Sequence, residues 1–206
     1  MESRSLVVVS AGLGQPSSTR LLADRLASAA ADALRDRGVE VAVEVVELRD
    51  LARDLADHLV AHATSPALRA ALDAVAGADG VVAVTPVFAA SYSGLFKSFV
   101  DVLDRDALTG VPVVVGATAG TQRHSLVLEH AMRPLFAHLR ALVLPTAVFA
   151  APEDWGGGTG GSTDALGGRV DRAAGELAAA VAARPARRPH DPFEDAPSFA
   201  DLLSGR

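Results

Sequence analysis

One stretch decides the fold: Gly80-Val-Val-Ala-Val84, continued by Thr85-Pro-Val-Phe-Ala-Ala-Ser-Tyr-Ser-Gly-Leu-Phe-Lys97. The first five residues are an apolar run, which predicts a buried strand, and the amphipathic run from Leu95 to Leu103 predicts a helix. The residues between them form a loop at the C-terminal end of a strand, where open α/β sheets bind ligands. Because this loop offers small residues, hydroxyls and two aromatic rings but no obvious acid or base, it suits holding a flat cofactor better than attacking a substrate.

Strands and helices alternate along the rest of the chain. Five strands separated by helices indicate an α/β fold, a three-layer sandwich with a parallel sheet covered on both faces. The five-strand count favours the flavodoxin-like order 2-1-3-4-5 over a six-stranded Rossmann sheet. The strands are predicted over residues 6–9, 39–46, 80–84, 111–115 and 142–149, and the helices over 17–37, 49–63, 66–76, 93–103, 124–141 and 164–183.

The C-terminal third contains two segments of unusual composition. Seven glycines fall within residues 156–168 and predict a mobile loop. Residues 184–206 form a proline-spotted tail, so we expect one domain over residues 1–183 followed by this tail. The basic residues at the start of the tail are expected to be solvated; they are Arg184, Arg187, Arg188 and His190.

Composition excludes several classes of function. The net charge of −6 argues against a nucleic-acid partner, and the absence of cysteine removes disulfides, thiolate catalysis and cysteine metal sites. The N-terminus lacks the pattern of an export signal, and no apolar run has the length of a membrane-spanning helix. We therefore expect a cytoplasmic protein without a membrane partner.

The loop after the first predicted strand could be read as a dinucleotide-binding fingerprint, because Gly12 and Gly14 have its spacing. Ser17 stands where the third glycine or alanine belongs, and Pro16 interrupts the tight turn. The acidic partner is expected about 20 residues further on, whereas Glu47 lies much later. This interpretation is therefore weak.

The same loop also has the features of a phosphate cradle. Ser17, Ser18 and Thr19 stand at the entry of a helix, where free backbone N–H groups and the helix dipole attract an anion. Their hydroxyls add hydrogen-bond donors without charge. A serine or threonine at this place also caps a helix when no ligand exists, but three consecutive hydroxyls exceed what a cap needs.

A third loop on the same edge follows the strand at 111–115. It runs from Gly116 through Thr118 to His124 and is again small and hydroxyl-rich, so its backbone N–H groups can approach a ligand closely. A site built on a nucleophile and a base would carry different residue types from those of these three loops.

Other chemistry has little support. The stretch Ser91-Tyr-Ser-Gly94 lacks the leading glycine of a hydrolase elbow. His58 and His62 have metal-ligand spacing on a helix but no accompanying acidic pattern. Lys97 is better explained by an ordinary salt bridge than by ligand binding. We therefore predict neither a metal site nor a catalytic side chain.

With these motifs in view, residues 5–150 resemble the NADPH-dependent FMN reductases, which supply flavin in two-component monooxygenase systems. The stretch from Thr85 to Lys97 is similar to that family's T-P-V-Y-x-A-S-[FY]-S-G-x-x-K signature, with Phe88 in place of a common tyrosine. Residues 117–121 resemble its A-T-G-G-[ST] turn, with Ala119 in place of a common glycine. His130 stands where some members carry a tyrosine that is associated with a helix bulge and with oligomer switching.

The resemblance implies a flavodoxin-like fold with FMN at the strand edge. The phosphate would lie at the first loop, the isoalloxazine ring along the signature loop, and the polar edge of the ring at the third loop. In that order, the implied residues are Ser10, Ser17, Ser18 and Thr19; Pro86, Val87, Phe88, Ser91, Tyr92 and Ser93; and Thr118, Ala119, Gly120 and Thr121.

The implied activity is hydride transfer from NADPH or NADH to FMN, with reduced FMN passed to a flavin-dependent monooxygenase. The protein would be a homodimer or a homotetramer. Two alternatives remain open at this point. One is a quinone or azo-dye reductase with bound FMN, and the other is a non-catalytic electron carrier, although the first loop lacks the T-x-T-G-x-T pattern of flavodoxins.

Overall fold

Valine-rich segments form the centre of the sheet, because branched side chains suit a pleated surface that is covered on both faces. A computed structural model describes residues 3–155 and 162–187. The strands are β1 (Ser3–Ser10), β2 (Glu40–Glu47), β3 (Gly80–Phe88), β4 (Ser91–Tyr92), β5 (Pro112–Thr118), β6 (Leu142–Val143) and β7 (Val148–Ala150).

The strands are joined in the order β2-β1-β3-β5-β6, and β7 also pairs with β5. All of these pairs are parallel. The predicted flavodoxin-like order is therefore confirmed, with β5 as the fourth strand and β6 and β7 as two pieces of the fifth. The count of five is corrected to seven, because the fifth strand is broken and β4 adds a short antiparallel partner to β3.

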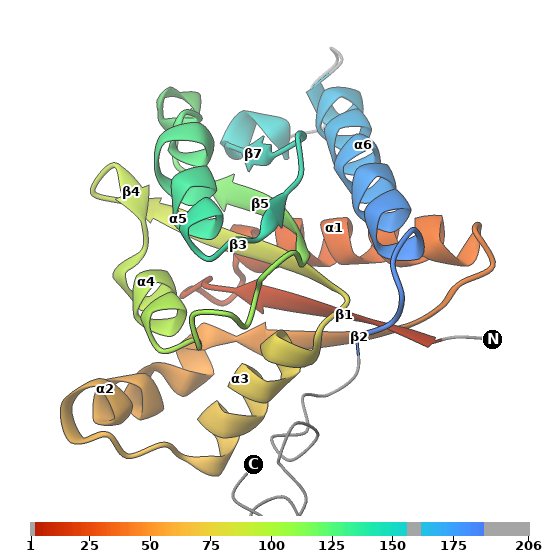
Figure 1. Cartoon of the computed structure of the whole chain (residues 1–206). Helices are drawn as coiled ribbons and strands as arrows, with labels where there is room; N and C mark the ends of the chain where they lie inside the picture. Colours follow the sequence, from red (N-terminus) through yellow and green to blue (C-terminus); the bar gives the residue numbers. More distant parts are fainter. Residues whose placement is uncertain (1–2, 156–161, 188–206) are drawn as a thin grey trace, which may run out of the picture.

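Helices cover both faces of this sheet (Figure 1). Their apolar residues recur at helical spacing, so each helix turns one stripe toward the strands. The α-helices are α1 (Ser18–Arg35), α2 (Ala52–Ala61), α3 (Pro66–Gly77), α4 (Gly94–Asp101), α5 (Arg133–His138) and α6 (Ser162–Ala182), and the shorter turns are 3₁₀ helices at Leu48–Leu51, Gln122–His124 and Pro152–Asp154 and a π-helix at Leu128–Met132.

Alternate residues of each strand enter two separate cores. Leu6 and Val8 of β1 pack against α1 and α6. Val7 and Val9 face the opposite core, which receives side chains from α2, α3, α4 and α5. This two-residue alternation between covered faces is the three-layer arrangement that the sequence predicts.

The fifth strand was predicted as continuous over 142–149, and this was wrong in its middle. Pro145 has no N–H to donate to a neighbouring strand. Arg133 of α5 donates to the carbonyls of Leu144 and Pro145 at 3.0 and 3.1 Å, and Glu176 of α6 accepts from the Thr146 N–H at 2.9 Å. Side chains from the helices thus bind the backbone groups that a strand would use.

The predicted helix over 124–141 was also wrong in its regularity. Its first half is a 3₁₀ turn followed by the π-helix at Leu128–Met132, and only Arg133–His138 is α-helical. Pro134 lies in the first turn of α5, where a proline needs no N–H partner and disturbs the turn before it. His130 lies within the π-helix and is exposed.

The glycine-rich loop was predicted too long. Helix α6 begins at Ser162 and contains Gly167 and Gly168, while residues 156–161 lie outside the described part of the chain. Most of the tail, from residue 188 on, lies outside it too, and the division into a domain and a tail stays a prediction. Arg187 is half-buried, contrary to the expectation of a solvated side chain.

Candidate functional site

Three segments meet at the C-terminal edge of the sheet: the loop after β1, the end of β3 and the loop after β5 (Figure 1). Together with the turn after β7 they border a cavity of about 320 Å³, here called the edge cavity. No charged residue of the described chain lines it. Its lining residues are Leu13, Gly14, Pro16, Ser17, Ser18, Thr19, Pro86, Val87, Phe88, Thr118, Ala119, Gly120 and Pro152.

The structure brings together most of the residues that the sequence singled out. Those that do not line the edge cavity are Ser10, Ser91, Tyr92, Ser93 and Thr121. Sequence reasoning missed Leu13, Gly14, Pro16 and Pro152. The first three belong to a loop that was already singled out, but nothing in the sequence places Pro152, 33 residues beyond Ala119, against that loop.

The first loop leads into the N-terminus of α1. The Ser17 hydroxyl accepts from the Arg20 N–H at 3.2 Å and caps the helix. A Cβ at Gly12 would lie 2.1 Å from the Ser17 Oγ, so the loop folds closely on itself at this glycine. Ser18 is exposed at the start of the helix. The cap leaves other backbone N–H groups of this helix start unsatisfied, since a helix start has more N–H groups than one cap can satisfy.

Ser10 lies at the end of β1, where it pairs with Glu47 of β2 and Val84 of β3. It is 1% exposed, and its hydroxyl makes no hydrogen bond with any other described residue. A buried hydroxyl without a partner is costly, and such groups are rare in folded proteins. Ser10 immediately precedes the first loop, but it does not line the edge cavity.

A buried hydroxyl pair joins the first and third loops. Thr19 and Thr118 are 2% and 3% exposed, and their Oγ1 atoms are 2.7 Å apart. This hydrogen bond connects the start of α1 to the end of β5. It fixes the first loop relative to the third loop, and these two loops are walls of the edge cavity.

The signature segment forms a β-hairpin rather than a plain loop, because β3 continues to Phe88 and pairs with β4. Ala89 and Ala90 form the turn, both with positive φ (47° and 67°), as hairpin turns of this type require. The hairpin leaves Phe88 48% exposed at the cavity. The predicted loop conformation over 85–92 was therefore wrong, although its position at the edge was right.

Hydroxyls within this segment hold it together. Thr85 is fully buried, and its Oγ1 accepts from the Ser93 N–H at 3.0 Å. The Ser93 hydroxyl in turn accepts from the Phe96 N–H at 3.2 Å and caps α4. Tyr92 packs on Phe96 at 6.1 Å between ring centroids. These residues position the hairpin without lining the edge cavity.

The third loop is joined to the turn after β7. The Ala119 N–H donates to the Ala150 carbonyl at 3.2 Å, and the Thr121 hydroxyl caps the following 3₁₀ turn by accepting from the Arg123 N–H. Asp154, 5% exposed, accepts from the Ala151 N–H and from Arg169 of α6 at 2.8 and 2.7 Å. This network fixes Pro152 as the fourth wall.

Glu47, at the end of β2, lies beside the first loop in space although it is distant in sequence. Its carboxylate forms ion pairs with Arg20 and Arg49, and a rotated amide lets Gln15 of the loop accept from Arg49 at 2.8 Å. A hydrogen bond to Asp24 is the main cause that raises the pKa of Arg20. Glu47 is therefore committed to arginines, which removes it as a ribose ligand and further weakens the dinucleotide interpretation.

The remaining candidates have structural roles. His58 Nδ1 lies 2.8 Å from the Thr64 hydroxyl, and His62 ends α2 with a left-handed backbone at φ 56°. Lys97 forms an ion pair with Asp101 one turn further along α4. Within residues 3–155 and 162–187, no cluster of three or more potential metal ligands occurs. None of the helices described there is long and apolar enough to cross a bilayer.

Known proteins resemble this chain over most of its length. Residues 5–156 match the family model of the NADPH-dependent FMN reductases. An FMN reductase (NADPH) of Pseudomonas aeruginosa is 37% identical over 150 residues, covering 73% of this chain and 78% of that protein. The NADH-dependent FMN reductase SfnF of Pseudomonas putida is 38% identical over 148 residues, covering 72% and 77%. The crystal structure of an oxidoreductase from Corynebacterium diphtheriae superposes with a TM-score of 0.85 at 46% identity, covering 90% of this chain and all of that one.

Proposed function

The chain belongs to the family of NADPH-dependent FMN reductases, and from this membership we propose that it reduces FMN with NADPH or NADH at the edge cavity. The observation that carries the proposal is the convergence of three uncharged, hydroxyl-bearing segments on one cavity. An enzyme whose substrates carry the redox chemistry themselves needs binding, orientation and exclusion of water from the protein rather than an acid or a base.

The residues around the first loop fit a phosphate monoester. Ser17 and Ser18 place two hydroxyls at the N-terminus of an 18-residue helix, whose free N–H groups and dipole favour an anion. The Ser10 hydroxyl, at the start of this loop, is buried without a partner. Together these groups offer donors to phosphate oxygens, and the lack of a lysine or arginine in the lining favours moderate affinity.

The walls of the edge cavity fit a flat ring. Phe88 and Leu13 are exposed apolar side chains that line it, at 48% and 52% of their surface. Pro86, Val87 and Pro152 add further apolar surface with little conformational freedom. We assign to these residues the contact with the isoalloxazine ring.

FMN held by the residues of the first loop and the hairpin would supply N5 as the acceptor of the hydride that C4 of NADPH or NADH donates. The third loop faces the part of the cavity assigned to the polar edge of the ring. The backbone N–H groups of Gly120 and Thr121, which lie beyond the strand β5 and the bond of Ala119 to Ala150, would stabilise negative charge on a reduced flavin bound there, as donors do in an oxyanion hole. The Thr19 to Thr118 hydrogen bond keeps these donors in place beside the phosphate loop.

We propose further that the protein supplies reduced FMN to a flavin-dependent monooxygenase. Release of the product requires a site that opens to solvent, and the exposed Ser18, Phe88 and Gly120 support this. Assembly as a homodimer or homotetramer belongs to the same proposal and rests on the resemblance of the sequence motifs.

The test is a titration of the purified protein with FMN, followed by NADPH and NADH oxidation with FMN, a quinone and an azo dye as acceptors. We expect saturable FMN binding and turnover with excess free FMN. Turnover of the quinone or the dye without added FMN, by protein whose FMN stays bound, would favour the alternative of a quinone or azo-dye reductase. Tight FMN binding with no NAD(P)H oxidation would identify an electron carrier and overturn the proposal.

A further inference from the structure

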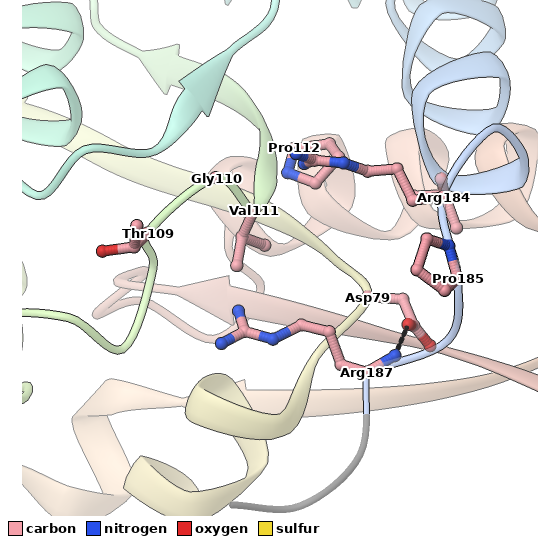
Figure 2. Close-up of a pocket in the computed structure, with 9 residues that line it drawn as sticks. Asp79, Thr109, Gly110, Val111, Pro112, Arg184, Pro185 and Arg187 are labelled. Carbon is pink, nitrogen blue, oxygen red and sulfur yellow. Dashed lines mark hydrogen bonds between the residues drawn. The ribbon is translucent and has the colours of Figure 1, made fainter.

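A second cavity, of about 280 Å³, lies at the opposite edge of the sheet, where β1, β3 and β5 begin (Figure 2). We call it the basal cavity. Its walls are the turn Thr109–Pro112, Asp79 just before β3, and the start of the tail with Arg184, Pro185 and Arg187. The parallel strands separate it from the edge cavity by their full length, so it is a different site.

The start of the tail is fixed in place by its backbone. The Arg187 N–H donates to one carboxylate oxygen of Asp79 at 2.6 Å, and the Ser5 N–H donates to the other at 2.8 Å. Arg4, which is 6% exposed, donates to the Arg184 carbonyl at 2.7 Å. These bonds hold the tail by its main chain and leave both arginine side chains to enter the cavity.

Both guanidinium groups reach the same turn. Figure 2 shows the side chains of Arg184 and Arg187 running from the tail toward Thr109–Pro112. Arg187 donates to the Ala107 carbonyl at 3.1 Å, and Arg184 lies so close to Gly110 that a Cβ there would be 3.2 Å from its Nη2. Gly110 has a φ of +69°, so a glycine suits the site for its backbone as well as for its space.

The charges in the basal cavity do not balance. Two guanidinium groups and one carboxylate line the cavity, and that carboxylate already accepts two backbone hydrogen bonds. Burial lowers the pKa of Arg187, the Asp79 charge raises it, and the charge of Arg184 lowers it again. Among the described residues, no carboxylate forms an ion pair with Arg184. A second anion would relieve this repulsion.

We propose that the basal cavity binds a small oxyanion, a phosphate group or a small phosphate ester, between the guanidinium groups of Arg184 and Arg187. Guanidinium forks match the several oxygens of a phosphate and keep their charge at any physiological pH. The cavity is slightly below the usual 300–1,000 Å³ of ligand pockets, which fits a small anion. The proposal does not rest on the function of the edge cavity.

The test is calorimetric titration of the FMN-saturated protein with inorganic phosphate, with ionic strength held constant by sodium chloride. FMN saturation keeps phosphate from the first loop. We expect one saturable site whose affinity falls roughly tenfold or more in Arg184→Gln and in Arg187→Gln, because each loses a charge-assisted contact. Arg184→Lys keeps the charge but loses the guanidinium fork, so its affinity should lie between those of the natural protein and Arg184→Gln.

Arg35→Gln is the matched control, because Arg35 is an exposed helix arginine outside the basal cavity. It should bind phosphate as the natural protein does. Ser18→Ala should also leave this phosphate site unchanged, which separates it from the first loop even if FMN fails to bind. If Arg187→Gln does not fold, Arg184→Gln carries the test alone. Phosphate affinity that is absent, or equal in the glutamine variants and the natural protein, overturns the proposal.

Discussion

Hydroxyl groups around the edge cavity divide into two sets at the scale of single residues. Ser17, Thr85 and Ser93 bind backbone N–H groups of the chain itself, and Thr19 binds Thr118. Ser10 and Ser18 have no such role among the hydrogen bonds of the described residues. The Ser17 hydroxyl only accepts in its bond with Arg20, so it can still donate to a ligand, whereas the hydroxyls of the second set form no bond within the described part of the chain. The sequence, which shows hydroxyls alone, does not make this distinction.

Replacement of Ser18 by alanine tests the second set directly. We expect FMN affinity to fall by about 1 kcal/mol, because one hydrogen bond to the phosphate is lost, with the free energy of unfolding unchanged. Fluorescence titration measures the affinity. Riboflavin, which has no phosphate, should bind equally to both proteins, and Ser28→Ala on the same helix is the control. Equal losses for FMN and riboflavin would contradict the assignment.

Ser10→Ala should separate folding from binding. The apo protein should become more stable by about 1 kcal/mol in urea unfolding, because a buried hydroxyl without a partner is removed. The same substitution should lower the affinity of the protein for FMN. Ser93→Ala, at an equally buried serine with a satisfied hydroxyl, should instead lose about 1 kcal/mol of stability with its helix cap. A destabilised Ser10→Ala apo protein would count against the ligand role.

At the scale of elements, the third loop forms a wall of the edge cavity, and a large side chain on this loop would block the cavity. Gly120 lines the edge cavity, has ordinary φ, and has open space where a Cβ would stand. Gly120→Leu should therefore fold normally and bind FMN roughly tenfold or more weakly, a change of about 1.4 kcal/mol or more. Gly77→Leu, an equally open glycine at the far end of α3, is the control. Normal FMN titration of Gly120→Leu would remove the third loop from the site.

The π-helix offers a prediction on pH. Its Glu129 accepts from Arg133, chiefly through a side-chain hydrogen bond, and this lowers the pKa of Glu129 below its ordinary value. A lowered folded-state pKa contributes stability above the unfolded pKa, and this contribution is lost as the pH falls through the folded pKa. The stability difference between the natural protein and Glu129→Gln should be about 0.5 kcal/mol at pH 7, because the pair is half exposed.

That difference should begin to fall as the pH drops below the ordinary glutamate pKa, and it should disappear once the pH is below the lowered pKa of Glu129 in the folded protein. Chemical unfolding at several pH values measures it. Asp32→Asn, which breaks the more exposed pair with Arg35 on α1, should show a smaller effect throughout. A difference that grows as the pH falls would have the wrong sign for this ion pair.

Elements with regular patterns were predictable, and those shaped by tertiary contacts were not. The runs of valine at 80–84 and 111–115 predicted central strands, because a strand that is buried on both faces has a nearly continuous apolar sequence. The broken fifth strand depends on Arg133 and Glu176, which come from two helices distant in sequence. Pro152 reached the site for a similar reason, through Asp154 and α6.

At the scale of the whole molecule, the two edges of the parallel sheet have different tasks. Loops at the C-terminal edge build the edge cavity, while the N-terminal edge holds the start of the tail through Asp79 and Arg4. The two groups of contacts share no residue. Changes at one edge should therefore leave the other intact, because ΔΔG values of distant sites without shared partners add independently.

Two shortened chains test this independence, one ending at Arg187 and one at Ala183. The difference between them isolates residues 184–187, whatever the later residues contribute. The chain that ends at Ala183 should be less stable by about 2–3 kcal/mol, because Asp79 and Arg4 each lose a charge-assisted hydrogen bond at a buried position. Both chains should bind FMN equally, because the bonds lost lie at the opposite edge of the sheet. Equal thermal midpoints for the two chains would show that residues 184–187 do not stabilise the fold, and weaker FMN binding by the shorter chain would show that the two edges are coupled.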